Sequence, residues 1–198
     1  MIKRIFDVII SLVGVIIFFP FLFFISLIIW KHDKKLPFYI SPRSGKNGVM
    51  FNMLKLRSMV MDADKAGINS IGNNDKRITP IGKKIRRLKL DEFPQLWNVL
   101  IGDMSFVGPR PNVKDETDFY TNVEKNLLLV KPGITDFSSI VFFDEGKILA
   151  DKKDPDLSYN QLIRPWKSRL GLIYIKHQSI LLDLLRNEVF SNSRFFDD

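Results

Sequence analysis

The feature that most constrains this 198-residue chain is a nearly uninterrupted apolar run from Val8 to Trp30. At about 1.5 Å per residue, these 23 residues would form a helix of roughly 34 Å, enough to cross the hydrocarbon core of a bilayer. A cleaved signal peptide is excluded because the run is too long and no small-residue cleavage site follows it. The rest of the chain is too short to bury such a segment, so we expect it to insert into a membrane.

Two features of this run favour a helix that enters the membrane and returns. Pro20 lies next to the midpoint, and a proline breaks or kinks a helix because it lacks the backbone donor and clashes with the preceding turn. Basic residues flank both ends, so the positive-inside rule gives no direction for crossing. The alternative is a spanning helix with a proline kink, which membranes tolerate. We predict a re-entrant helix-break-helix over residues 1–35 and a separate domain at the membrane surface over residues 36–198.

The amino-acid composition excludes several kinds of functional site and some binding partners. The chain has 30 Lys and Arg against 22 Asp and Glu, a formal net charge of +8, and no cysteine. The lack of cysteine excludes a disulfide framework, a Cys-ligated zinc site and a thiol nucleophile. The basic excess suits lipid headgroups, substrate phosphates or nucleic acid. Because the basic residues lack interleaved aromatic residues, we expect phospholipid and phosphate partners and no nucleic acid.

Residues 36–60 have the pattern of a β-hairpin. Two short apolar runs, 38–40 and 49–51, flank a polar segment, 41–48, that contains proline and glycine. Such runs separated by turn residues predict two paired strands.

Helical patterns dominate the remainder. From Ile81 the apolar residues recur at helical spacing, and Pro94 fits the first turn of a second helix that starts near Leu90. Further helices are predicted over residues 113–130 and 164–189. The predicted fold class is therefore α+β and mostly helical, with the membrane helix, amphipathic surface helices and a small β-hairpin.

The adjacent carboxylates Asp91 and Glu92 are the first candidates for chemistry, because they directly follow a dense basic cluster, residues 83–89. One carboxylate could attack or accept a proton while the other binds a metal ion. A helix N-terminus lowers carboxylate pKa values, so we expect both groups to be charged. The alternative is an ordinary capping pair in a first helical turn.

Basic residues supply the second set of candidates. Arg110 stands between two prolines, which stiffen the backbone and present a guanidinium suited to phosphate or carboxylate. Lys55 and Arg57 alternate along one strand face. The alternative for Arg110 is a solvated side chain in a surface turn.

Several strings in the chain together resemble one known family. They are Lys3-Arg4-Ile5-Phe6-Asp7, Arg43-x-Gly45, Lys55-x-Arg57-Ser58-Met59, the block from Leu88 to Pro111 with its Asp91-Glu92 and Pro109-Arg110-Pro111, and Lys131-Pro132-Gly133-Ile134-Thr135. The chain resembles the small monotopic phosphoglycosyl transferases, bacterial sugar transferases that load a sugar phosphate onto undecaprenyl phosphate. The likeness covers almost the whole chain, and its central block is very specific.

This resemblance implies an enzyme at the cytoplasmic face of the bacterial inner membrane. Asp91 would attack a UDP-sugar, release UMP and carry the phosphosugar to undecaprenyl phosphate, and Glu92 would bind Mg²⁺. The resemblance also places Arg86 and Arg110 near phosphates, with Lys55 and Arg57 as further substrate-binding candidates. A homo-oligomeric state stays open.

Two departures from the family pattern stand out. The family breaks its membrane helix at Ser-Pro, whereas this chain has Phe19-Pro20. The family continues Gly-Ile-Thr with Gly-Trp-Ala-Gln-Val-x-Gly-Arg, whereas residues 136–145 here share none of the usual glycine, tryptophan, glutamine and arginine. This second departure favours a rival hypothesis, a noncatalytic membrane-anchored module that keeps the fold.

Overall fold

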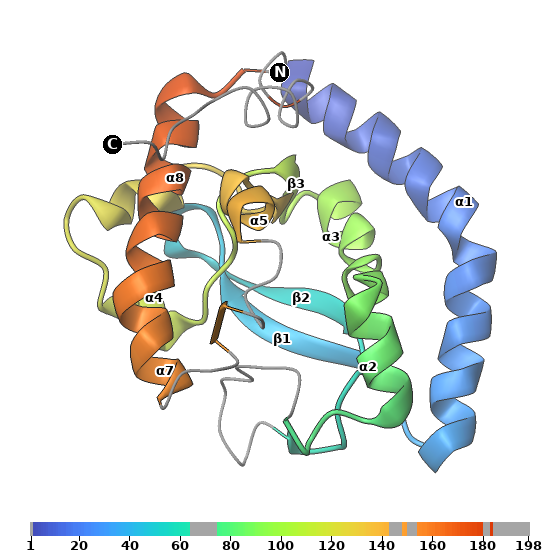
Figure 1. Ribbon diagram of the computed structural model, residues 1–198. Helices are drawn as coiled ribbons and strands as arrows, with labels where there is room; N and C mark the ends of the chain where they lie inside the picture. Colours follow the sequence, from blue (N-terminus) through green and yellow to red (C-terminus); the bar gives the residue numbers. More distant parts are fainter. Residues whose placement is uncertain (1, 64–74, 143–147, 150–153, 180–182, 184–198) are drawn as a thin grey trace.

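The computed structural model describes residues 2–63, 75–142, 148–149, 154–179 and 183. Within these residues helices predominate, and the strands form two sheets of two strands each. The prediction of a mostly helical α+β fold is confirmed. Figure 1 shows the long α1 running along one side of the remaining elements.

Helix α1, Ile2–Asp33, contains Pro20 and is continuous. Among the described residues, it is the one helix long and apolar enough to cross a membrane by length and composition. The predicted break at Pro20 is wrong, because helical residues continue on both sides of it. One proline removes a single backbone donor, and the adjoining turns keep their own hydrogen bonds, so a long helix curves instead of ending. Figure 1 shows this curvature.

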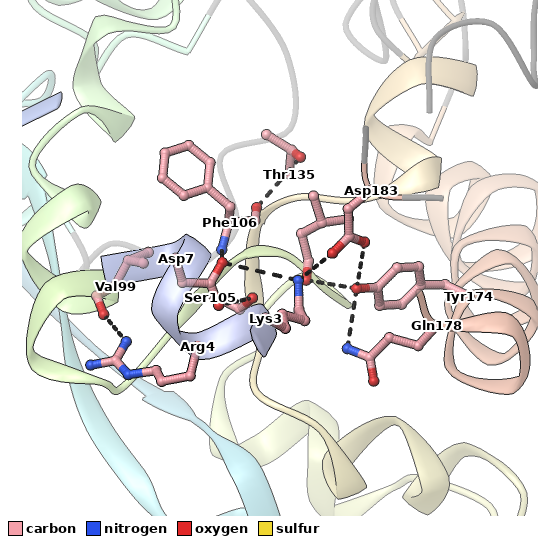
Figure 2. Close-up of polar contacts among 11 residues, drawn as sticks. Lys3, Arg4, Asp7, Val99, Ser105, Phe106, Thr135, Tyr174, Gln178 and Asp183 are labelled. Carbon is pink, nitrogen blue, oxygen red and sulfur yellow. Dashed lines mark hydrogen bonds and ion pairs between the residues drawn. The ribbon is translucent and has the colours of Figure 1, made fainter. Parts of the chain in front are cut away.

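Polar contacts fix the N-terminal end of α1 to the rest of the fold (Figure 2). Arg4 donates to the carbonyls of Val99 and Leu100, at 2.5 and 2.9 Å. These carbonyls belong to the last turn of α3, Gln95–Ile101, where a helix leaves acceptors without a partner. Arg4 of α1 therefore caps the C-terminal end of α3.

Asp7 makes the second attachment of this end. Its side chain is buried, and it accepts hydrogen bonds from the Ser105 hydroxyl at 2.8 Å and the Phe106 amide at 3.1 Å. Both donors belong to β3, Ser105–Val107. Asp7 thus links the start of α1 to the strand that leads into the Pro-Arg-Pro loop.

The C-terminal end of α1 is attached through apolar packing. Ile25 and Ile29 are buried against Leu56 and Ile85. These partners lie on β2, Met50–Leu56, and α2, Pro80–Arg87. Both ends of α1 consequently contact the same folded unit.

The predicted hairpin is confirmed, with longer strands than expected. Strand β1, Phe38–Ser44, pairs antiparallel with β2, and Phe38 lies opposite Leu56 while Ser44 lies opposite Met50. The turn η1, Lys46–Gly48, joins them. The strands extend into the predicted loop because the connection needs only a few residues once Asn47 and Gly48 adopt positive φ.

The predicted helix over residues 113–130 is wrong as a single element. The structure has α4, Lys114–Asp118, followed by a separate 3-10 helix, η4, Glu124–Leu129. The reason is a reciprocal cap, in which Thr121 and Glu124 each accept from the backbone N–H of the other. Such a capping box starts a new helix and interrupts the previous one.

The remaining elements pack around strand β3 and helix α8. Strand β3 pairs in parallel with β4, Gly133–Thr135. Helix α5, Phe137–Val141, packs on α8, Arg164–His177, which is preceded by α7, Pro155–Ser158, and a π-helical turn, η5, Tyr159–Ile163. The predicted helix from residue 164 is confirmed as far as His177, and most of its predicted continuation lies outside the described residues.

We predict that Asp7→Ala lowers thermal stability. The substitution leaves the Ser105 hydroxyl and the Phe106 amide without their acceptor, and a buried unpaired donor costs about 1–3 kcal/mol. Thermal unfolding of the detergent-solubilised full chain measures the effect. The control is Asp118→Ala, which removes an exposed carboxylate; equal melting temperatures for the two variants would contradict the assigned role.

Candidate active site

The two carboxylates of the dyad lie on one short turn between two helices. After α2, Lys89 adopts a left-handed conformation with φ of 56° and turns the chain into the 3-10 helix η3, Leu90–Glu92. Helix α3 then starts after Pro94. Asp91 and Glu92 are therefore part of a connection, partly buried, and not in the first turn of a long helix.

The buried Asn98 fixes α3, and with it this turn, to the hairpin. Its amide oxygen accepts from the Leu54 amide at 2.9 Å, and its amide nitrogen donates to the Asn52 carbonyl at 2.8 Å. Both partners are backbone groups of β2, so one side chain satisfies two groups at that strand. This arrangement brings Lys55 of β2 to the dyad.

Glu92 is held by two cations. Arg110 donates to Oε1 at 2.8 Å, and the Lys55 ammonium lies 4.0 Å from the same oxygen. Burial would raise the pKa of Glu92, but the charges of Arg110 and Lys55 outweigh it and lower the pKa to about 2. Glu92 is therefore a permanent anion at neutral pH.

Asp91 has the opposite shift. Burial raises its pKa above the ordinary value, although the charges of Lys55 and Arg86 act in the other direction. The expectation that the turn lowers both pKa values is wrong for Asp91, because desolvation exceeds the effect of the neighbouring cations. The environment thus separates the two carboxylates, a pattern typical of pairs with different tasks.

Arg86 approaches the site from α2. Its Nε donates to the Ser58 hydroxyl at 2.8 Å, and its charge acts on Asp91. Of the four predicted substrate-binding cations, Lys55, Arg86 and Arg110 thus act on the dyad.

The structure places the fourth predicted cation, Arg57, elsewhere. Its guanidinium is buried and donates to both carboxylate oxygens of Asp33, at 2.6 and 2.7 Å, as well as to the Leu36 carbonyl. These contacts tie the end of α1 to the end of β2. Arg57 therefore holds the end of α1 and not the dyad.

A small cavity of about 140 Å³ opens beside the dyad, with three cations among the residues around it. The described residues that line it include Arg43, Lys55, Gln95, Arg110, Asn112, Glu116 and Tyr159. From the sequence, Arg43 was named only within a family string and had no predicted role at the site, because residues 41–48 were predicted to be a loop. The register of the hairpin shows that Arg43 belongs to the site. Arg43 pairs with Phe51, and Lys55 with Tyr39, so both cations lie on one face of the hairpin.

The divergent segment after Thr135 has a structural use as far as residue 142. Asp136 caps α5 by accepting from the Ser139 amide at 2.7 Å. Phe137 is buried and packs edge-on against Tyr174, with ring centroids 5.4 Å apart. The divergent residues as far as 142 thus supply a helix cap and core packing; residues 143–145 lie outside the described part of the chain, and the noncatalytic hypothesis stays untested.

The donor set near the dyad suits a Mg²⁺ ion that keeps most of its ligands from water and substrate. The described residues hold no group of three or more acidic, histidine or cysteine side chains that could bind a metal by themselves. The contacts of Glu92 with Arg110 and Lys55 both use Oε1, so Oε2 can serve as one oxygen ligand. Mg²⁺ is commonly bound by one or two carboxylates together with phosphates and water.

Comparison with known proteins decides the family, because residues 1–186 match the family described as bacterial sugar transferase. The chain belongs to the bacterial sugar transferase family. The resemblance stated from the sequence strings is thereby confirmed, as is the prediction of a transferase at the level of the family.

Three relatives illustrate the range of this sugar transferase family. The undecaprenyl-phosphate galactose phosphotransferase of Salmonella typhimurium is 36% identical over 72% of this chain and 35% of its own length. The UDP-glucose:undecaprenyl-phosphate glucose-1-phosphate transferase of Klebsiella pneumoniae is 34% identical over 92% and 37%. The exopolysaccharide production protein ExoY of Rhizobium meliloti is 37% identical over 68% and 66%. The chain thus spans about a third of the first two relatives and two thirds of the third.

We predict that Arg57→Met lowers the melting temperature by several degrees, because it removes a bidentate partner of Asp33 and leaves a carbonyl of the connection unpaired. Binding of UMP, measured by calorimetry on the folded variant, should be unchanged. Arg110→Met is the matched comparison: it should weaken UMP binding with a smaller loss of stability, since its side chain is largely exposed. A selective loss of UMP binding in Arg57→Met would contradict the assigned role.

Proposed function

We propose that this sugar transferase moves a sugar 1-phosphate from a UDP-sugar to undecaprenyl phosphate at a membrane surface, with release of UMP. The donor class and the acceptor are those that the Klebsiella relative's name gives. The relatives' names differ in the sugar, so the proposal assigns none.

One observation carries the proposal: the cation-flanked dyad lies directly against the apolar helix. Phe93, the residue after Glu92, packs on Phe18 of α1 with ring centroids 4.4 Å apart. A soluble sugar nucleotide and a lipid-borne phosphate can therefore reach the same carboxylate, one from the cavity side and the other from the membrane side.

In the first step a carboxylate oxygen of Asp91 attacks the β-phosphorus of the UDP-sugar. A new P–O bond forms to Asp91 while the bond between the β-phosphorus and the bridging oxygen breaks, and the electron pair leaves with UMP. Lys55 and Arg86 act on Asp91 electrostatically, so they are placed to offset the negative charge of the phosphoryl group that approaches it.

In the second step the phosphate oxygen of undecaprenyl phosphate attacks the same phosphorus. The bond to Asp91 breaks and the carboxylate is regenerated, while the lipid carries the sugar diphosphate away. Dividing the transfer in this way lets two anionic substrates use the site in turn, which gives ping-pong kinetics.

Glu92 would hold Mg²⁺ through its second oxygen together with diphosphate and water oxygens. Bound there, the ion would neutralise charge on the diphosphate. Arg110 keeps Glu92 ionised and oriented in the meantime.

The attachments of α1 support a membrane helix that stays on one side of the bilayer. Arg4 and Asp7 bind the domain at one end, and Ile29 and Asp33 bind it at the other. A helix of 32 residues is about 48 Å long. A domain that lies wholly on one face of the membrane could not contact both ends of a helix that crosses it.

We therefore propose a re-entrant or interfacial helix with the domain at the cytoplasmic face of the inner membrane. Exposed apolar side chains along α1, among them Ile16, Phe19 and Phe24, provide the surface for the lipid chains. Phospholipid contact along α1 follows from this placement, and the oligomeric state stays a prediction.

We predict that Asp91→Asn lowers UMP release from a UDP-sugar by about a thousandfold or more, the order found when a covalent nucleophile is removed. The assay combines a panel of UDP-sugars with Mg²⁺ and undecaprenyl phosphate. Asp118→Asn, an exposed carboxylate paired with Lys114, is the control and should keep full activity. Undiminished release by Asp91→Asn would remove Asp91 from the mechanism.

We also predict that donor without acceptor leaves a phosphosugar on the protein, visible as a mass increase of the intact chain. The adduct should be absent in Asp91→Asn and should disappear when undecaprenyl phosphate is added, because the lipid phosphate attacks it. Steady turnover with no adduct in any quenched sample would refute the two-step route.

Single cysteines test the topology, since the natural chain has none. Ile2→Cys and Lys35→Cys mark the two ends of α1, both at exposed positions, and Lys114→Cys marks the domain. In sealed inverted vesicles an impermeant maleimide should label all three alike. Labelling of one end from the opposite face would establish a spanning helix.

A further inference from the structure

Arg43 is a cation of the cavity that none of the preceding steps uses. It lies on β1, half-buried, and lines the same cavity as Lys55 and Arg110. Its pairing opposite Phe51 puts it on the hairpin face that carries Lys55. The fold thus places a third cation beyond the two that contact Glu92.

Unlike those two, the Arg43 side chain makes no hydrogen bond and no ion pair with any described residue. Its Nε is enclosed by protein and has no acceptor. Folded proteins rarely leave a buried donor unpaired, and an exception calls for an explanation, such as a ligand that supplies the acceptor.

The surroundings of Arg43 indicate the charge of that ligand. Burial and the nearby charge of Arg110 lower the pKa of Arg43, and the carboxylate of Glu116 offsets this lowering only in part. Among the described residues that line the cavity, Glu116 is the one acidic residue beside three cations. The cavity therefore holds positive charge that its own residues do not neutralise, and this charge attracts an anionic ligand.

We propose that Arg43 binds the phosphate group of the nucleoside monophosphate that leaves when Asp91 attacks the donor. This assignment rests on the proposed function and deepens it, because it gives the α-phosphate a residue of its own. Lys55 and Arg86 act at the phosphorus under attack, and Arg110 orients Glu92. Arg43 holds the departing phosphate through its planar guanidinium, which matches phosphate oxygens bidentately.

The position of the cavity favours a nucleotide phosphate over the lipid phosphate. No residue of α1 lines it; its described walls come from the hairpin, the Pro-Arg-Pro loop, α3, α4, Gly133 and η5. The cavity of about 140 Å³ has room for several water molecules, or for a phosphate group in their place. A lipid phosphate is expected on the α1 side of the dyad, where Phe93 meets Phe18.

The test is UMP binding to the full chain in detergent, measured by calorimetry. Arg43→Met should weaken UMP about 10–100-fold, the range for losing a charge-assisted bidentate contact, without lowering the melting temperature, because it removes an unpaired half-buried cation. Arg43→Lys keeps the positive charge but not the planar guanidinium, so its UMP affinity should lie between those of the natural chain and Arg43→Met. If Arg43→Met does not fold, Arg43→Lys serves as the test variant. Lys46→Met removes an exposed cation from the same hairpin and should bind UMP like the natural chain.

Three results would overturn the assignment of Arg43: UMP affinity within twofold of the natural chain in Arg43→Met, an equal loss in Lys46→Met, or a loss confined to farnesyl phosphate, a short lipid phosphate measured in parallel. In each case the phosphosugar adduct on Asp91 can still form, so only the role of Arg43 fails. Absence of both UMP binding and adduct in the natural chain would instead remove the proposed function, and Arg43's role with it.

Discussion

The rest of this structure depends on the attachment of one apolar helix to a single domain at both of its ends. At the start of α1, Arg4 donates to two carbonyls in the last turn of α3, and Asp7 accepts hydrogen bonds from two donors of β3. At its end, Asp33 binds the buried Arg57. Buried polar groups are costly without partners, so these contacts fix the helix against the elements that carry the dyad. The turn that carries Asp91 and Glu92 is thereby held against the apolar helix, as the proposed meeting of a soluble and a lipid substrate requires.

Burial and neighbouring cations together set the pKa values of the two carboxylates. Burial acts to raise the pKa of both members of the dyad, but Glu92 has Arg110 in contact, whereas Lys55 and Arg86 act on Asp91 through their charge. One carboxylate is kept as a fixed anion, and the other is less stabilised in its charged form. This asymmetry suits a pair in which one member orients charge and the other forms and breaks a bond.

The chain belongs to the family although the segment after Thr135 departs from the family pattern. The family string that normally follows Thr135 is replaced by residues that cap α5 and fill the contact between α5 and α8. The described part of the replacement does not line the cavity. In this chain the divergent residues as far as 142 therefore contribute to the packing of α5 on α8 and not to the cation-lined cavity.

Local pattern was sufficient for several element types: the apolar helix, the hairpin and the start of the helix at residue 164 could be predicted, because spacing and turn residues act over a few positions. It did not predict that Asp91 and Glu92 lie on a short turn ahead of α3. Strings specific to one family also identified the family to which the chain belongs. The sequence could not reveal that Arg57 binds Asp33, that Arg43 joins Lys55 on one face, or that burial raises the pKa of Asp91. Those outcomes depend on strand register and on which distant surfaces exclude water, and only the tertiary structure sets both.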